Sequence, residues 1–192
     1  MAIPEAERKE LLRLARAAVA AEVARRAMPF GPGLTAEGPA LPEPAGVLGE
    51  KRGCFVTLTN AGRLRGCIGT FHPQVPLAAQ VVEMGRAAAR DYRFAYEPIT
   101  PAELPALTVQ VSVLSELTPI ADPLDIELGV HGIYIIRGGS AGCFLPEVAT
   151  ETGWSKEEFL SHCCAGKAGM SADAWKDPKT KVLVFTSEKF AE

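Results

Sequence analysis

The spacing of hydrophobic residues predicts a helix near the start of the chain. Over residues 5–28 the apolar positions recur at helical spacing, and most basic residues lie off that stripe. The stripe consists of Leu11, Leu12, Ala15, Ala18, Val19, Val23 and Ala27. We interpret the basic residues as a solvated face. Residues 29–50 hold five prolines and five glycines, so we expect a long surface connection there instead of a helix or strand.

Two segments, 53–59 and 64–70, alternate in the manner of strands and predict a β-hairpin. Two loop lengths fit between them. A three-residue loop over 60–62 lets Gly62 adopt the left-handed conformation of a bulge. A two-residue loop would require a positive φ at Ala61, which has a Cβ atom. We therefore predict the three-residue loop.

The loop length decides which side chains of the second strand face which partners. The three-residue loop sets Cys67 opposite Phe55, with Gly66 on the apolar, core-facing side. It also sets Arg65 opposite Thr57. Arg65 and Cys67, two residues apart, are then expected on one face, where a guanidinium favours the reactive thiolate. The strand predicts a candidate site, for which the alternative is a packed cysteine beside a salt-bridged arginine.

The rest of the chain shows strands and helices in irregular order. Helices are predicted over 75–90 and, broken at Gly153, over 146–165, and strands over 107–114, 132–137, 143–145 and 182–186. This order indicates an α+β fold with a mainly antiparallel sheet flanked by helices. The regular strand–helix alternation and the glycine-rich loop of a dinucleotide-binding or P-loop fold are absent from the sequence.

Composition narrows the class of protein further. The 192 residues are 47% hydrophobic and 22% charged, which is ordinary for one well-buried domain. The net charge of −3 argues against a general nucleic-acid binder. No apolar run reaches the roughly 20 residues of a membrane span, and no signal-peptide core is present, so we expect a cytoplasmic protein. The five cysteines form no C-x-x-C pair, so we expect neither a disulfide framework nor a metal site.

Five further side chains are candidates for a site, each with a structural alternative. Asp91 and Arg93 lie at a helix exit, where such pairs are often capping groups. His131 precedes a predicted strand and is the best general-base candidate, although a lone histidine is more often structural. Glu147 lies on a first helical turn, where a carboxylate suits the helix dipole regardless of chemistry. Lys167 lies between glycines and could bind an anion or be a solvated loop lysine.

The run LRGCIGT at 64–70 resembles the signature of the AMMECR-type domain family, whose bacterial and archaeal members are called AmmeMemoRadiSam system protein A. Further matching pieces lie at 53–58, 91–94, 111–114, 129–133, 145–149, 154 and 164–169. The match runs to Phe185, so 1–192 is predicted to be one such domain. The resemblance implies an α+β fold with a larger and a smaller lobe, and polar motif residues at a cleft. Many members carry glutamine where this chain has Glu147.

The resemblance implies companions but no settled reaction. It predicts a radical SAM protein and a Memo-type protein as partners. Our first hypothesis is an enzyme or enzyme subunit acting on a small anionic or electrophilic molecule. In it Cys67 is the nucleophile and Arg65 orients the ligand. His131 would transfer protons, oriented by Asp91 or Glu147.

The second hypothesis is a non-catalytic binding module that presents the same cleft to a peptide, a metabolite or its companions. In either case Gly66, Arg93 and Lys167 join Arg65 and Glu147 as ligand-binding candidates. The cofactor, the substrate and the oligomeric state stay open, a homodimer among them.

Overall fold

The structure is a computed structural model that describes residues 2–27 and 38–192. The chain divides into two compact units. Unit 1 is Met1–Val113 with Glu188–Glu192, and unit 2 is Leu114–Ser187. The expected single domain over 1–192 stays a prediction. Part of the predicted connection, 29–37, lies outside the described residues, and the rest carries the 3-10 turn η1 (Gly46–Gly49).

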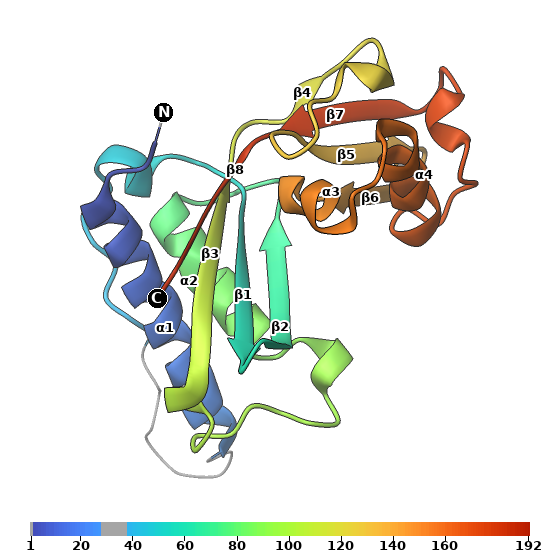
Figure 1. Cartoon of the computed structure of the whole chain (residues 1–192). Helices are drawn as coiled ribbons and strands as arrows, with labels where there is room; N and C mark the ends of the chain where they lie inside the picture. Colours follow the sequence, from blue (N-terminus) through green and yellow to red (C-terminus); the bar gives the residue numbers. More distant parts are fainter. Residues whose placement is uncertain (1, 28–37) are drawn as a thin grey trace. The chain divides into compact units, whose positions relative to one another are not determined.

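Unit 1 packs two helices against a four-stranded sheet (Figure 1). The helices are α1 (Glu5–Ala27) and α2 (Leu77–Ala88). The strands are β1 (Cys54–Asn60), β2 (Arg63–Thr70), β3 (Leu107–Leu114) and β8 (Ser187–Ala191). They are ordered β2-β1-β3-β8, with β1 antiparallel to β2 and β3. Short 3-10 turns follow α2 as η2 (Tyr92–Phe94) and precede β3 as η3 (Leu104–Ala106).

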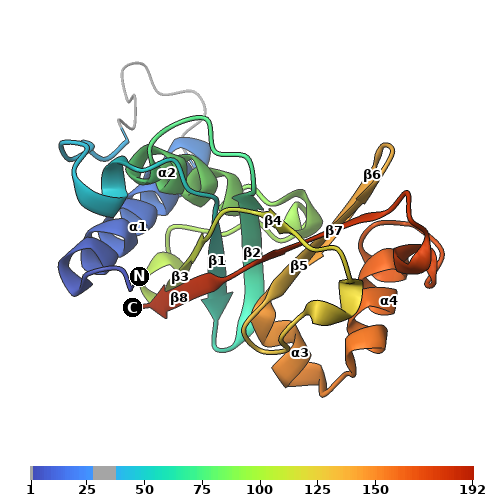
Figure 2. The same cartoon turned by 90° about the horizontal axis from the view of Figure 1, so that it is seen from above.

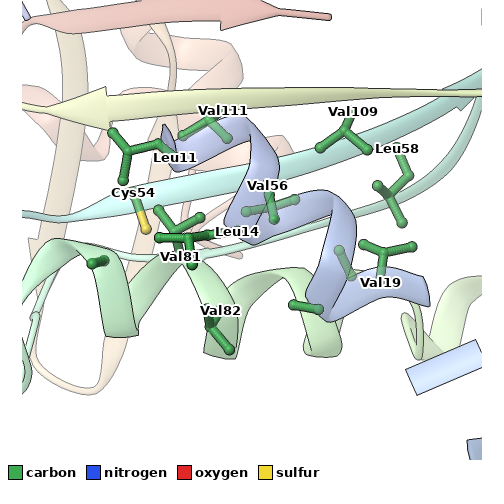
Figure 3. Close-up of a cluster of buried hydrophobic side chains, with 14 of the residues drawn as sticks. Leu11, Leu14, Val19, Cys54, Val56, Leu58, Val81, Val82, Val109 and Val111 are labelled. Carbon is green, nitrogen blue, oxygen red and sulfur yellow. The ribbon is translucent and has the colours of Figure 1, made fainter. Parts of the chain in front are cut away.

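The core of unit 1 lies between the helices and the inner face of the sheet (Figure 3). It contains Leu11, Leu14, Val19, Cys54, Val56, Leu58, Val81, Val82, Val109 and Val111. The predicted first helix is confirmed, with one correction to its apolar stripe. Leu14 is fully buried, whereas Leu12 is half-buried and Ala27 is exposed.

The predicted three-residue hairpin loop is wrong. The loop holds two residues, and both take positive φ, 48° at Ala61 and 79° at Gly62. A β-bulge compensates, because Thr59 pairs with Leu64 but Leu58 pairs with Gly66. The extra residue in β2 restores the alternation that buries the apolar face.

The bulge changes the partners of the two motif residues. Arg65 is the residue that the bulge leaves without a partner in β1. Cys67 pairs with Thr57 and not with Phe55, which instead pairs with Gly69. The predicted pairings of Cys67 and Arg65 are therefore both wrong. The prediction that Gly66 lies on the core side holds, because that side follows from the hydrophobic pattern.

Unit 2 has a second antiparallel sheet with its own core. Its strands are β4 (Thr118–Pro119), β5 (Gly132–Arg137), β6 (Ser140–Phe144) and β7 (Lys181–Phe185), ordered β4-β7-β5-β6. The helices are α3 (Pro146–Thr152) and α4 (Lys156–Gly166), and the 3-10 turns are η4 (Pro123–Asp125) and η5 (Ala174–Lys176). Helix α4 contacts β5 and β6, and α3 contacts β5 (Figure 2). The α+β class with antiparallel sheets is confirmed.

The helix break in unit 2 follows from local sequence. Gly153 ends α3 in the left-handed conformation, with φ of 68°. Ser155 then caps α4 and exchanges hydrogen bonds with Glu158 in a capping box. The predicted break at Gly153 is confirmed. Within 2–27 and 38–192, no helix has the length and apolar character needed to cross a membrane.

Candidate functional site

Two of the motif segments, 64–70 and 91–94, meet at the edge of the sheet in unit 1. Asp91 Oδ2 accepts a hydrogen bond from the Cys67 N–H at 3.0 Å. Arg93 Nη2 donates to the Cys67 carbonyl oxygen at 2.9 Å. Strand β2 is an edge strand, so its outward backbone groups have no neighbouring strand to pair with. The two side chains satisfy the outward N–H and C=O of Cys67, and we call Asp91, Arg93 and the Cys67 backbone the edge clamp.

Asp91 is the centre of the edge clamp. Its side chain is wholly buried and also accepts bonds from Arg93, at 3.1 Å from the backbone N and 2.9 Å from Nε. Burial by itself raises the pKa of this carboxyl, but the bonds from the Arg93 side chain and from two N–H groups prevail and lower it. A carboxylate so engaged is a poor proton acceptor. Its contacts are those of a structural anchor, and its acid–base role stays a prediction.

Arg93 places a cation close to Cys67. The hydrogen bond to Asp91 raises the pKa of Arg93, burial opposes this, and the charges of Asp91 and Cys67 raise it further. Just under half of the Arg93 side chain is exposed. A half-exposed guanidinium in this position is available to an anionic ligand as well as to the thiol.

The thiol of Cys67 lies on the face of the sheet away from the core. Its neighbour Ile68 packs against the core, so alternation turns Cys67 to the other side, where Thr57 Oγ1 donates to its Sγ at 3.2 Å. Cys67 is half-buried. The other cysteine of the hairpin, Cys54, is fully buried in the core, and burial raises its pKa to about 12.

Arg65 is held away from the thiol. Its Nε donates to Glu103 Oε1 at 2.6 Å, and its Nη2 donates to Glu103 Oε2 at 3.0 Å and to the Glu97 carbonyl at 2.9 Å. Only 4% of Arg65 is exposed. The expected pairing of this guanidinium with Cys67 on one face is wrong, because the bulge redirects Arg65. The guanidinium beside Cys67 belongs to Arg93.

Gly66 allows β2 to approach the end of α2. A Cβ atom at this position would lie 2.1 Å from the carbonyl oxygen of Ala88. The same carbonyl accepts the N–H of Asp91. The glycine therefore lets strand, helix end and clamp segment converge, which is a role in close approach.

The remaining candidates belong to unit 2. His131 closes the turn before β5. Its side-chain Nδ1 accepts a hydrogen bond from the backbone N–H of Glu127 at 3.1 Å, and its backbone N–H donates to the Glu127 carbonyl oxygen. Lys167 ends α4, with Nζ 5.7 Å from the ring centroid of Phe144. Glu147 lies on the first turn of α3. A site shared by these residues and Cys67 stays a prediction.

Sequence reasoning missed two partners that define the surroundings of the motif. Thr57 donates to the thiol, and its cross-strand position could have been found from the correct register. Glu103 binds Arg65 from 38 residues away, and no local pattern marks it. In the described ranges, no group of three or more His, Cys, Asp or Glu side chains is arranged to hold a metal ion.

Comparison with known proteins establishes the family. The AMMECR1 family model matches residues 12–190. A protein from Methanothermobacter thermautotrophicus is 43% identical over 153 residues, covering 76% of this chain and 78% of that protein. Protein TK0174 of Thermococcus kodakarensis is 44% identical over 156 residues, covering 76% and 75%. The chain belongs to the AMMECR1 family, as its motifs predict.

A solved structure supports the fold. The crystal structure of the uncharacterized protein PH0010 from Pyrococcus horikoshii is similar, with a TM-score of 0.85 and 35% sequence identity. The similarity covers 99% of this chain and 93% of that one. The names of these relatives state no reaction, ligand or partner, so the similarity supports family and fold alone.

Proposed function

We propose that this AMMECR1-family protein is a non-catalytic binding subunit that contacts a protein partner beside its edge clamp. Five large hydrophobic side chains are exposed in the described part of the chain, and three of them flank the clamp. Tyr92 is 79% exposed, Tyr96 is fully exposed and Leu64 is 36% exposed. We call these three residues the turn surface. Tyrosines are enriched at protein interfaces, where they often carry much of the binding energy.

The hydrogen bonds of the charged motif residues favour a structural role for them over a catalytic one. Asp91 and Arg65 direct their charges at groups of the protein itself, namely Arg93 with the β2 edge and Glu103. Arg63 pairs with Glu97, which ties the far end of the 91–97 segment to β2 as well. A segment fixed at both ends presents Tyr92 and Tyr96 with little entropy to lose on binding. This fixed presentation is the observation that carries the proposal.

The partners that we propose are a radical SAM protein and a Memo-type protein, the companions that the AmmeMemoRadiSam resemblance implies. We also propose that the protein works in the cytoplasm. Cys54, Cys67, Cys163 and Cys164 are reduced thiols, which suits a reducing compartment.

Replacing both tyrosines of the turn surface is expected to weaken capture of these partners. We expect a Tyr92→Ala, Tyr96→Ala double variant to bind them at least about 30-fold more weakly, which corresponds to the roughly 2 kcal/mol of a single hot-spot tyrosine. The measurement is co-purification followed by titration with the purified radical SAM and Memo-type proteins. Leu41→Ala and Val130→Ala are matched controls, because these exposed hydrophobics lie outside the turn surface. Equal binding by the double variant and wild type would refute the proposal.

A second candidate function is an enzyme for which Cys67 supplies the nucleophile. One observation favours it: Cys67 is half-buried beside the guanidinium of Arg93. Three other cysteines are fully buried, namely Cys54, Cys163 and Cys164, and burial raises the pKa of each. Cys67 is thus better placed than these three to act as a nucleophile.

Alkylation of the native protein tests the accessibility that this second function needs. We expect iodoacetamide to label Cys67 at least about 100-fold faster than the three buried cysteines, which would react only after unfolding. Peptide mass spectrometry locates the label, and Cys67→Ser is the control for its assignment. Labelling of Cys54 at the same rate as Cys67 would contradict the structure. The first function predicts that Cys67→Ala still captures the partners, whereas a nucleophilic role predicts loss of turnover with binding intact.

A further inference from the structure

Unit 1 contains a hollow of about 260 Å³ where the C-terminal ends of α1 and α2 approach Arg65. Among the described residues, four arginines line it, Arg25, Arg26, Arg65 and Arg90, together with one carboxylate, Asp91. The pairing of Asp91 with Arg93 in the edge clamp already neutralises that carboxylate. Glu103 pairs with Arg65, so the excess positive charge of the lining comes from Arg25, Arg26 and Arg90. Phe94 and Ala95 of the lining belong to the same segment as Tyr92 and Tyr96 of the turn surface.

The carboxylates near the hollow do not balance its arginines. Glu22 alone serves two of them, at 2.7 Å from Arg25 Nη2 and 3.5 Å from Arg90 Nε. Arg26 donates to the carbonyl oxygen of Ala89 at 3.1 Å, and within the described ranges it forms no ion pair. Positive charge is left over at the rim, where Arg25 and Arg90 are each more than half exposed.

Arg65 supplies a buried donor without an acceptor. Its Nε and Nη2 are occupied by Glu103 and the Glu97 carbonyl, but its Nη1 has no hydrogen-bond partner among residues 2–27 and 38–192. Glu97 Oε2 forms an ion pair with Nη1 at 3.8 Å, which is beyond hydrogen-bond reach. A buried polar group left in this way costs folding free energy unless something satisfies it.

Capping of helix ends accounts for part of this cluster. Basic side chains near a helix C-terminus interact favourably with its dipole, and Arg26 caps the end of α2 directly. Capping does not explain Arg65, which lies in a strand and directs no bond at a helix end. The carboxylate of Glu22 shared by two arginines, and the charge of Arg26 that no described carboxylate pairs, together favour an anion in the hollow.

We propose that this hollow binds a phosphate group, held by the arginines that line it, with Arg25 and Arg90 exposed at its rim. Each guanidinium group can donate paired hydrogen bonds to phosphate oxygens. Several guanidinium groups together can neutralise a phosphate dianion, which carries more charge than a carboxylate ligand. The volume is just below the roughly 300–1,000 Å³ typical of sites for drug-sized ligands, so the ligand is inorganic phosphate or a small phosphate ester. This anion site goes beyond the proposed partner binding, although its lining includes Phe94 and Ala95 of the segment that carries Tyr92 and Tyr96.

Titration of the full chain with inorganic phosphate at low ionic strength tests the site. We expect saturable binding at one site, and at least tenfold weaker binding by the Arg25→Ala, Arg26→Ala double variant. Arg13→Ala is the matched control, because Arg13 lies on the same helix and pairs with Glu10 as Arg25 pairs with Glu22. The side chain of Arg13 is 54% exposed, and that of Arg25 is 56% exposed. Its affinity is expected to stay within twofold of wild type.

A second arm distinguishes the two sources of phosphate. Tighter binding of glycerol 1-phosphate than of inorganic phosphate assigns the site to a phosphate ester, and the reverse order assigns it to free phosphate. Acetate is expected to bind at least tenfold more weakly than either. Absence of saturable phosphate binding, or an equal loss in the Arg13→Ala control, would overturn the proposal.

Discussion

Substituting alanine for Gly66 is expected to lower the free energy of unfolding by about 3 kcal/mol. The new Cβ would lie 2.1 Å from the Ala88 carbonyl oxygen, so either β2 or the end of α2 must move. The φ of Gly66 is not positive, so the loss comes from the close approach and not from backbone strain. Because Ala88 also accepts the N–H of Asp91, displacement would loosen the edge clamp too.

Urea denaturation of matched variants checks this expectation. Gly139→Ala is the control, since a Cβ there meets no atom within 4 Å and its φ is not positive. We expect the control to change the free energy of unfolding by no more than about 0.5 kcal/mol. Equal stabilities for the two variants would mean that β2 and α2 do not approach as closely as described.

Replacing Asp91 by Asn is expected to lower the free energy of unfolding by about 2 to 3 kcal/mol. The buried carboxylate accepts bonds from the Cys67 N–H and from Arg93, and an amide can replace only some of them. We place the effect below the full cost of breaking a buried pair because Arg93 is partly exposed to solvent.

Asp122→Asn is the matched control for Asp91→Asn. Asp122 caps η4 by accepting the N–H of Leu124, two residues on, just as Asp91 accepts the N–H of Arg93. It differs in being exposed, so we expect a change of no more than about 1 kcal/mol. A similar loss of unfolding free energy in both variants would mean that Asp91 contributes no more than the helix cap at Asp122.

The pH dependence of the Asp91 variant follows from the direction of its pKa shift. Folding lowers the pKa of Asp91 from its ordinary value of 3.8, so the ionised carboxylate stabilises the folded state above that value. This contribution is lost as the pH falls through the folded-state pKa. The stability difference between wild type and Asp91→Asn should therefore be largest near neutral pH and shrink below about pH 4.

The hydrophobic pattern predicts which face of β2 is buried, but not the loop that precedes it. The alternation of residues in β2 favours Gly66 toward the core and Cys67 away from it, and the bulge keeps this arrangement with a two-residue loop. The loop itself depends on Ala61 accepting a positive φ, an uncommon conformation for a residue with a Cβ atom. The bulge at Arg65 lets the two-residue loop coexist with the buried apolar face of β2. No residue type in the hairpin predicts this bulge.

The surroundings of Arg65 and Cys67 depend on contacts between distant segments, which the sequence pattern does not predict. Arg65 and Cys67 are close in sequence, yet Glu103 holds one and Thr57 contacts the other. The resemblance to a family selects both the 64–70 and the 91–94 segments, but only the structure shows that Asp91 bonds to the Cys67 backbone. Pairing an edge strand with side chains leaves no periodic signal in the sequence.

The claim on which this account depends is that the 91–94 segment closes the edge of β2 at Cys67. Amide hydrogen exchange at Cys67 tests it most directly, since an edge-strand amide without a partner exchanges freely. In the wild-type protein we expect the Cys67 amide to exchange at least about 100-fold more slowly than an unprotected amide. In the Asp91→Asn variant we expect the Cys67 amide to lose most of that protection. A wild-type Cys67 amide that exchanges at the unprotected rate would contradict the clamp, and with it the fixed presentation of Tyr92 and Tyr96.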